Sequence, residues 1–374
     1  MHIVRGPEGR RAAFVPGASS LAVVAVLVIA GCAGHDAPVG DFKEDFRKAL
    51  HLRDAGDQQG AIEVFQRLVK ERPDDPDLLS ELARAYLVSG DFDAAIDIAN
   101  RAIASKIGRG EVFYVLLAGA YDGARRSLPG EEAIRRGIRE YPDVAMLRFC
   151  LGLNLQKQGR MDEALKALQE SLRLDPTHAS SWDLMAQTLS DTNRRVPAIV
   201  AYVRFLSIEP ASARSRPALQ RLEDLIFWGN GRPTKGNEIR IEPSDDPNDP
   251  WYKCSILLST LASKRHEGKG VTMNDGQYFA GLIELVSLSL DNFIAESDVE
   301  PFWKAHAVAY LDEARARGHL EAMSWSIRAS LDDGETRDWL HAHTDALDRY
   351  RAWSAAWRPA AAGGGATPHT APGP

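Results

Sequence analysis

The sequence repeats itself with a period of about 34 residues, and this period constrains the fold more than any other feature. Pro142, Pro176 and Pro210 are spaced by 34 residues, and Pro73 lies 69 residues, about two periods, before the first of them. Two sets of small or turn-forming residues keep the same period: Ala61, Ala95, Ala164 and Ala198, and Gly56, Gly90, Gly159 and Asn193. Each proline follows a run with helical periodicity, so the sequence predicts stacked helical hairpins and an all-α fold.

The repeat has a recognisable internal pattern. In residues 145 to 178, Gly152 lies on a first helix, Ala164 and Leu168 lie on a second, and Pro176 ends the unit. This pattern resembles the tetratricopeptide repeat (TPR), a helix, turn, helix unit of 34 residues. The third copy resembles it least, because Gly130 stands where alanine is expected. The resemblance covers about residues 42 to 212 and implies a right-handed superhelix with a concave groove, in five copies that begin near residues 42, 76, 111, 145 and 179.

The resemblance also implies which side chains line the groove, since the first helix of each unit forms most of it. These groove positions are Phe46, Leu50, Arg53, Arg84, Leu87, Val112, Val115, Asp122, Met146, Phe149, Leu153, Gln156, Lys157, Asp183 and Gln187. The basic and asparagine pattern with which some members hold a carboxylate is absent. Two uses of this apolar-centred lining stay open. It binds an extended or helical partner segment with apolar anchors, or the C-terminal region of the same chain covers Met146, Phe149 and Leu153.

The first 31 residues are predicted to be an export signal. Three arginines precede an apolar run of ten residues, Leu21 to Ala30, which is far shorter than the roughly 20 residues that a transmembrane helix needs. The run ends in Val28, Ile29, Ala30, Gly31 and Cys32, which resembles the lipobox of bacterial lipoproteins. That resemblance implies cleavage before Cys32, a diacylglycerol on its sulfur and acylation of the new amino terminus, which together anchor a protein stably to a membrane.

The predicted mature chain is acidic and lies in the bacterial cell envelope. Removal of residues 1–31 deletes three arginines and one glutamate, leaving 42 basic and 51 acidic residues and a formal charge of −9. Such a charge argues against nucleic acid as a partner. Ala33 is not the aspartate of inner-membrane retention signals, so we expect the outer membrane, facing the periplasm, with the inner membrane or secretion as alternatives. The expected partners are other envelope proteins or peptide segments.

The sequence after the repeats predicts a second helical region. Residues 32–41 form a tether, residues 42–228 hold the array and a capping helix, and residues 229–250 form a linker rich in glycine and proline. Residues 251–358 predict a smaller all-helical domain, with runs near 251–265, 277–294, 299–317, 319–331 and 335–355. Six of the eight tryptophans lie there and are expected mainly in its core. The tail, residues 359–374, is predicted to be disordered.

The sequence shows no recognisable catalytic, cofactor or metal constellation. His341 and His343 are two residues apart, whereas residues three or four apart share a helix face. Cys150 and Cys254 pair in an oxidising compartment or remain buried thiols, and sequence leaves both open. The resulting hypothesis is a lipid-anchored, non-enzymatic scaffold that serves envelope assembly, secretion or pilus-type machinery. The alternative is a C-terminal domain with ligand-binding or enzymatic activity that the repeats target.

Overall fold

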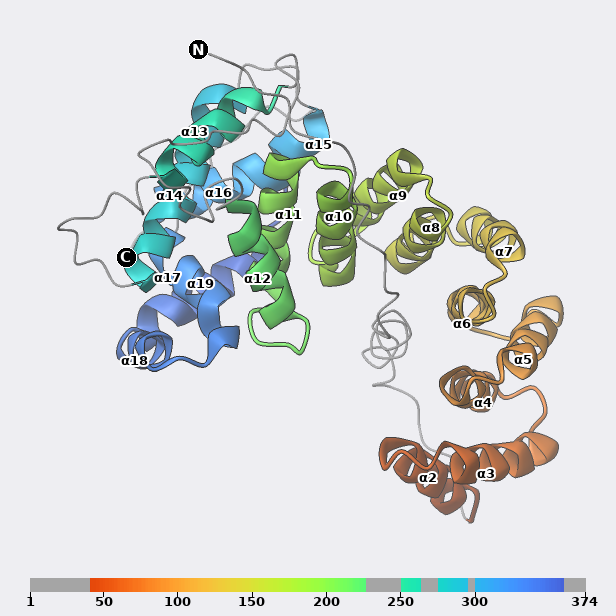
Figure 1. Ribbon diagram of the computed structural model, residues 1–374. Coiled ribbons are helices and arrows are strands. Elements are labelled where there is room, and N and C mark those ends of the chain that lie inside the picture. Colours follow the sequence, from red (N-terminus) through yellow and green to blue (C-terminus); the bar gives the residue numbers. More distant parts are fainter. Residues whose placement is uncertain (1–40, 227–249, 264–274, 295–299, 360–374) are drawn as a thin grey trace, which may run out of the picture. The chain divides into compact units, whose positions relative to one another are not determined.

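A computed structural model describes residues 41–226, 250–263, 275–294 and 300–359, and every regular element among them is a helix (Figure 1). The predicted signal peptide, Cys32, nearly all of the predicted linker and nearly all of the tail lie outside these residues. The chain divides into two units, residues 1–133 and 134–374, and each is described by itself. None of the described helices is long and apolar enough to cross a membrane.

The first unit consists of three helical hairpins. The first helix of each hairpin begins at or within one residue of the predicted copy starts at residues 42, 76 and 111. The pairs are α2 (Asp41–Asp54) with α3 (Gln58–Glu71), α4 (Pro76–Ser89) with α5 (Phe92–Ala104), and α6 (Gly110–Gly123) with α7 (Ser127–Glu140), which crosses the boundary between the units.

The residues that recur with the period sit in the turns between paired helices. Gly56, Gly90, Gly159 and Asn193 have φ angles of 87°, 86°, 76° and 59°, the left-handed region that glycine and asparagine adopt at low cost. In the third copy Arg125 takes the equivalent place with φ 57°. The third hairpin therefore forms although its sequence pattern is weak.

Small residues allow neighbouring helices to approach closely. A Cβ atom built on Gly152 of α8 (Ala145–Lys157) would lie 2.8 Å from Cγ of Leu168 on α9 (Met161–Leu174). A Cβ on Gly123 of α6 would lie 2.2 Å from the ring of Phe92 on α5. Any larger residue at either position would have to displace its neighbour, which explains why glycine stands there.

The second unit begins with two further hairpins and a capping helix. The hairpins are α8 (Ala145–Lys157) with α9 (Met161–Leu174), and α10 (Ala179–Asp191) with α11 (Arg195–Ile208), followed by α12 (Ser215–Ile226). The buried Arg195 side chain donates hydrogen bonds of 2.7 and 2.9 Å to the carbonyls of Leu225 and Ile226. These bonds cap the C-terminus of α12, which packs against α11.

The C-terminal helices follow the predicted runs with two differences. They are α13 (Tyr252–Ser263), α14 (Asp275–Ile294), α15 (Pro301–Trp303), a π-helical turn (Lys304–Val308), α16 (Ala309–Ala316), α17 (Leu320–Ile327), a 3₁₀ turn (Arg328–Leu331), α18 (Gly334–Ala342) and α19 (Thr344–Ala356). The run near 299–317 contains the π turn, and the run near 335–355 breaks at His343. At the break, His343 stacks flat on Trp339, which stacks on Trp325, so side-chain packing accompanies the interruption.

Most tryptophans of the C-terminal helices are core residues, as expected. Trp251, Trp303, Trp325 and Trp357 are buried, and Trp339 and Trp353 are half-buried. One carboxylate, that of Glu313, holds two indole rings in place. Trp353 of α19 and Trp357, which directly follows that helix, donate hydrogen bonds to it at 3.2 and 3.0 Å. The aromatic residues therefore form an ordered interior with satisfied polar edges.

Candidate protein-binding faces

The first helices of the second unit, α8, α10 and α12, carry the best-defined candidate surface, which we call the first-helix face. On α8, Met146 and Gln156 are half-buried and Lys157 is exposed. Phe149 is only 2% exposed and Leu153 only 9%. The Phe149 ring packs against the His178 ring from the loop before α10, with centroids 5.4 Å apart. The apolar centre of this face is therefore largely filled by the repeats themselves.

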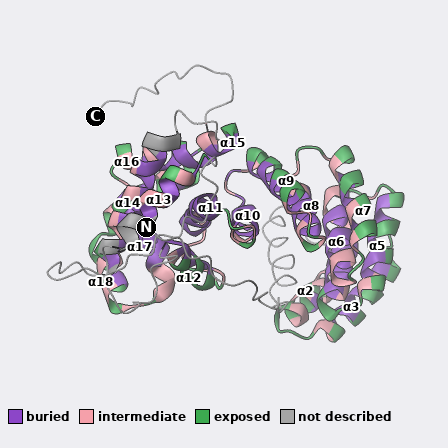
Figure 2. Cartoon of the chain, turned by 45° about the horizontal axis from the view of Figure 1, so that its top comes forward, coloured by how far each residue is buried: buried purple, intermediate pink, exposed green. Residues whose placement is uncertain are grey.

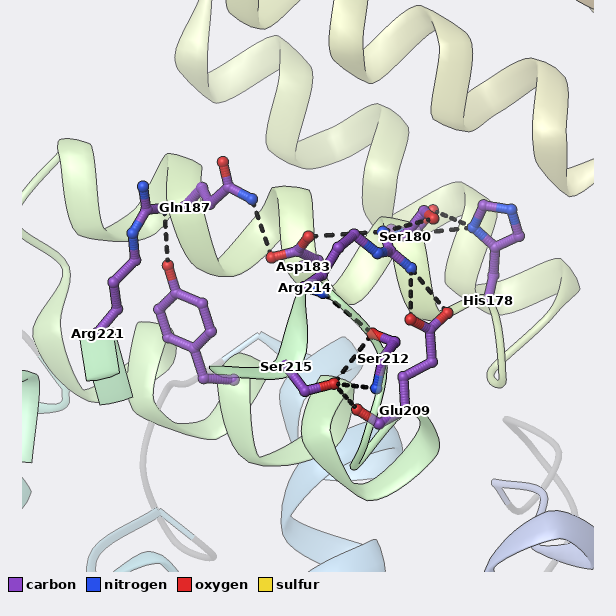
Figure 3. Close-up of polar contacts among 11 residues, drawn as sticks. His178, Ser180, Asp183, Gln187, Glu209, Ser212, Arg214, Ser215 and Arg221 are labelled. Atoms are coloured by element: carbon purple, nitrogen blue, oxygen red, sulfur yellow. Dashed lines mark hydrogen bonds and ion pairs between the residues drawn. The ribbon is translucent and has the colours of Figure 1, made fainter. Parts of the chain in front are cut away.

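Arg214, at the start of α12, organises the polar part of the first-helix face (Figure 3). Its guanidinium makes two hydrogen bonds of 2.7 Å to the carboxylate of Glu209, donates to Ser180 Oγ at 3.0 Å and lies 3.6 Å from the carboxylate of Asp183. The Ser215 hydroxyl holds Glu209 as well, because it donates a hydrogen bond to the Glu209 carbonyl at 2.6 Å. One cation thus joins α10 to α12 and fixes the direction of both carboxylates.

Asp183 is the most desolvated acid of this face. Burial raises the pKa of its carboxyl group, and the 2.9 Å hydrogen bond from Gln187 and the nearby Arg214 oppose that rise. Burial also raises the pKa of Asp191, two turns further along α10, against the effect of Arg221. Both carboxyl groups of α10 are thus partly desolvated, and Arg214 and Arg221 partly offset that cost.

Arg221 is an exposed cation beside these acids. It donates a long hydrogen bond of 3.4 Å to the hydroxyl of the buried Tyr202, as Figure 3 shows. The predicted groove residues did not include Arg214 and Arg221, because the predicted repeats extend only to about residue 212. Each lies 34 residues after a first-helix residue of α10, Ser180 and Gln187. One more period would have placed both on this face.

A serine and a histidine meet in the second unit without forming a catalytic pair. The Nδ1 atom of His178 lies 2.8 Å from Ser181 Oγ and accepts the backbone N–H of the same residue at 3.3 Å. Ser181 is fully buried and donates to Ser171, which donates to the carbonyl of Ala145. His178 is therefore the N-cap of α10, and the serine is closed to substrate.

The first unit carries a separate cluster on its own first helices. The Glu81 carboxylate of α4 bonds to Arg53 of α2 and lies 3.6 Å from Arg84 of α4. Arg84 and Leu87 are buried, whereas Phe46, Leu50 and Arg53 are half-buried. The Phe46 ring packs edge-on against Phe65, with centroids 6.0 Å apart. The predicted groove residues of this unit are thus a buried ion cluster with a partly exposed apolar rim.

The remaining candidate site residues are two cysteines and two histidines. Cys150 and Cys254 are both buried and form no disulfide with each other, and Cys254 donates to the Ser289 carbonyl at 3.5 Å. No cluster of His, Cys, Asp and Glu side chains within the described residues has the geometry to hold a metal ion. His341 and His343 lie exposed at the end of α18.

Two segments of the array match models of known repeat families. Residues 52–106 and residues 145–178 each match a family described as tetratricopeptide repeat. The two matched segments are tetratricopeptide repeats. The TPR array runs from α2 to α11 and is followed by α12 and the further helices.

Curated proteins with similar sequence resemble only a part of this chain. The human protein O-mannosyl-transferase TMTC1 is 24% identical over 174 residues, which is 46% of this chain and 20% of that protein. The peroxisomal targeting signal receptor of Candida glabrata is 31% identical over 75 residues, 20% of this chain and 12% of the receptor. The TPR chain therefore spans a fifth or less of the length of these relatives.

Solved structures with similar folds also match about half of the chain. The TPR protein TTC0263 of Thermus thermophilus matches 50% of this chain and 98% of its own, with 23% identity and a TM-score of 0.43. MamA of Desulfovibrio magneticus matches 45% of this chain and 94% of its own, with 13% identity and a TM-score of 0.38.

Proposed function

We propose that this TPR protein is an exported, lipid-anchored scaffold that binds other envelope proteins through its first-helix faces. The observation that carries the binding role is the group of polar side chains on α10 and α12, where half-buried Gln187 donates to the buried Asp183 carboxylate and the exposed Arg221 lies beside them. Preorganised groups of this kind lower the entropic cost of recognition. The partner is an extended or helical segment that donates to α10 and crosses toward α12.

The similarity of part of the chain to peroxisomal targeting signal receptors supports recognition of a peptide segment. The envelope location is supported by the sequence before the described residues. Three arginines, a ten-residue apolar run and Cys32 follow the order of a lipoprotein signal. Lipidation of Cys32 would tether an acidic scaffold to the outer membrane with its repeats in the periplasm. We assign no enzymatic activity or cofactor to the chain.

The binding role is tested with a double variant of the first-helix face. Gln187→Arg with Arg221→Glu reverses the polar pattern of the face at half-buried and exposed positions, so the repeats should still fold. Lys166→Glu on α9 is the matched control, because Lys166 is exposed on a second helix. We expect partner capture by crosslinking from native membranes to be lost in the double variant and kept in the control. Equal capture by both variants would remove this face from the proposal.

The anchoring role is tested separately with Cys32→Ala. We expect the wild-type protein to fractionate with the outer membrane and the variant to be released from it, with the repeats unchanged. If the variant stays in the same membrane fraction, Cys32 is not the anchor. The two experiments are independent, since a soluble scaffold would still bind its partner through α10 and α12.

A further inference from the structure

Helix α11 is buried on every side, which is unusual for the second helix of a repeat. Every residue from Arg195 to Ser207 is buried, and Figure 2 shows the helix buried along nearly its whole length. In the preceding repeat, α9 keeps a solvent face with exposed Lys166, Glu170 and Arg173. A helix that is apolar all round requires cover on the face that its neighbours leave to water. The sequence of α11 therefore demands a second packing partner.

The C-terminal helices supply that cover. Within the second unit, α11 contacts α10 and α12, and it also contacts α13, the π turn, α17 and α19. Figure 1 shows α11 with α10 on one side and the C-terminal helices on the other. Polar and aromatic contacts extend the interface to the neighbouring helices. Gln169 of α9 donates to Glu300 at 2.7 Å, and Trp182 of α10 packs against Phe302 with centroids 6.0 Å apart.

A buried arginine stands at the centre of this interface. Arg204 of α11 is 2% exposed, and its Cζ atom lies 3.5 Å from the centroid of the Tyr310 ring, 5.0 Å from Trp357 and 5.5 Å from Trp182. Its Nε and Nη1 atoms have no hydrogen-bond partner in the described structure. The ring faces therefore provide most of the compensation for a buried charge, and such contacts are strongest where water is excluded.

The rings around Arg204 are held in place by their own contacts. The Tyr310 hydroxyl lies 2.7 Å from Ser354 Oγ, and its ring stacks on Trp353 with centroids 4.9 Å apart. Trp357 is fixed by its bond to Glu313, and Trp182 donates to the Pro176 carbonyl at 2.9 Å. The rings of Tyr310, Trp357 and Trp182 thus form an aromatic cage around Arg204. Tyr310 and Trp357 come from the C-terminal region, and Trp182 comes from α10. The cage exists only when the C-terminal helices are docked.

We propose that the C-terminal helices, α13 to α19, form an outer cap over α11 of the repeat array and that Arg204 is the latch that fastens them to it. This assignment goes beyond the binding role of the first-helix face, because it gives the second half of the chain a function of its own. Helix α10 takes part in both structures: the Trp182 ring forms a wall of the cage, and the next residue, Asp183, lies on the first-helix face. The docked helices thereby hold α10 in position.

The test uses the full chain with a protease cleavage sequence inserted in residues 229–250, the predicted linker. After cleavage, a docked cap keeps the two fragments together, so we expect them to co-elute in size-exclusion chromatography. Arg204→Lys keeps the charge but loses the planar stacking group and places a more strongly hydrated ammonium in the cage. We expect it to weaken fragment association by about tenfold or more. The matched control, Arg216→Lys, changes an exposed arginine of α12 and should leave association unchanged.

A second variant acts from the other fragment. Trp357→Leu removes one wall of the cage without touching the repeats, and we expect the same tenfold weakening measured by dilution of the cleaved complex. This variant decides the outcome if Arg204→Lys fails to fold. Separation of the wild-type fragments on cleavage would overturn the cap. If both cage variants co-elute and their fragments associate with unchanged affinity, Arg204 does not fasten the C-terminal helices to the array.

Discussion

Replacing Gly152 by alanine tests whether close helix approach is what the repeat period encodes. The new Cβ would lie 2.8 Å from Cγ and 2.9 Å from Cδ2 of Leu168, whereas carbon atoms in contact prefer about 3.5–4.0 Å. Overpacking of this kind costs about 1–3 kcal/mol, and alanine regains about 1 kcal/mol over glycine inside a helix. We therefore expect Gly152→Ala to destabilise the second unit by about 0–2 kcal/mol.

The sign of this effect should reverse when its cause is removed. Leu168 is fully buried, so Leu168→Ala alone costs about 2–5 kcal/mol. In that background the obstructing atoms are gone, and Gly152→Ala should stabilise the protein by about 1 kcal/mol through helix propensity and partial filling of the cavity. A double-mutant cycle therefore predicts strong coupling between the two positions.

The assay can address the second unit alone. All eight tryptophans lie between residues 182 and 357, inside the second unit, so denaturant unfolding followed by tryptophan fluorescence reports that unit. Circular dichroism of the same samples reports both units. The reasoning is refuted if Gly152→Ala costs the same free energy of unfolding with Leu168 and with alanine at that position.

Three further predictions concern buried polar groups. Burial lowers the pKa of His178 and His306 below the usual 6.5, so the folded protein binds fewer protons than the unfolded chain. The contribution of these residues to stability is therefore full above pH 6.5 and falls as the pH drops through that value. His178→Asn should remove part of this pH dependence, measured as unfolding midpoints over a range of pH. Burial raises the pKa of Cys254 to about 11, so at pH 8 its reaction with a thiol reagent should follow the unfolding rate, and fast labelling of the native protein would contradict this. Arg195→Met leaves two carbonyls at the end of α12 uncapped and should destabilise the second unit by about 1–3 kcal/mol in the fluorescence assay, while unchanged stability would show that the cap contributes little.

The candidate site was only partly predictable, and particular residues show why. The period placed Gln187 and Asp183 correctly on α10, next to the polar cluster of α12. It also placed Phe149 and Leu153 in a groove, where the structure buries them against other side chains. Helical periodicity identifies the face on which a residue lies, but whether that face stays open depends on what packs over it.

The sequence alone determined the hairpins, their number and their turns, because a 34-residue period, a left-handed turn residue and a small residue at the helix crossing are local requirements. The tertiary structure alone decided the role of Arg204, the π turn before α16 and the break at His343. Arg204 reads in sequence as an ordinary polar residue of a repeat helix. Its burial depends on Tyr310 and Trp357, more than 100 residues away, and contacts over such separations leave no periodic trace in the chain.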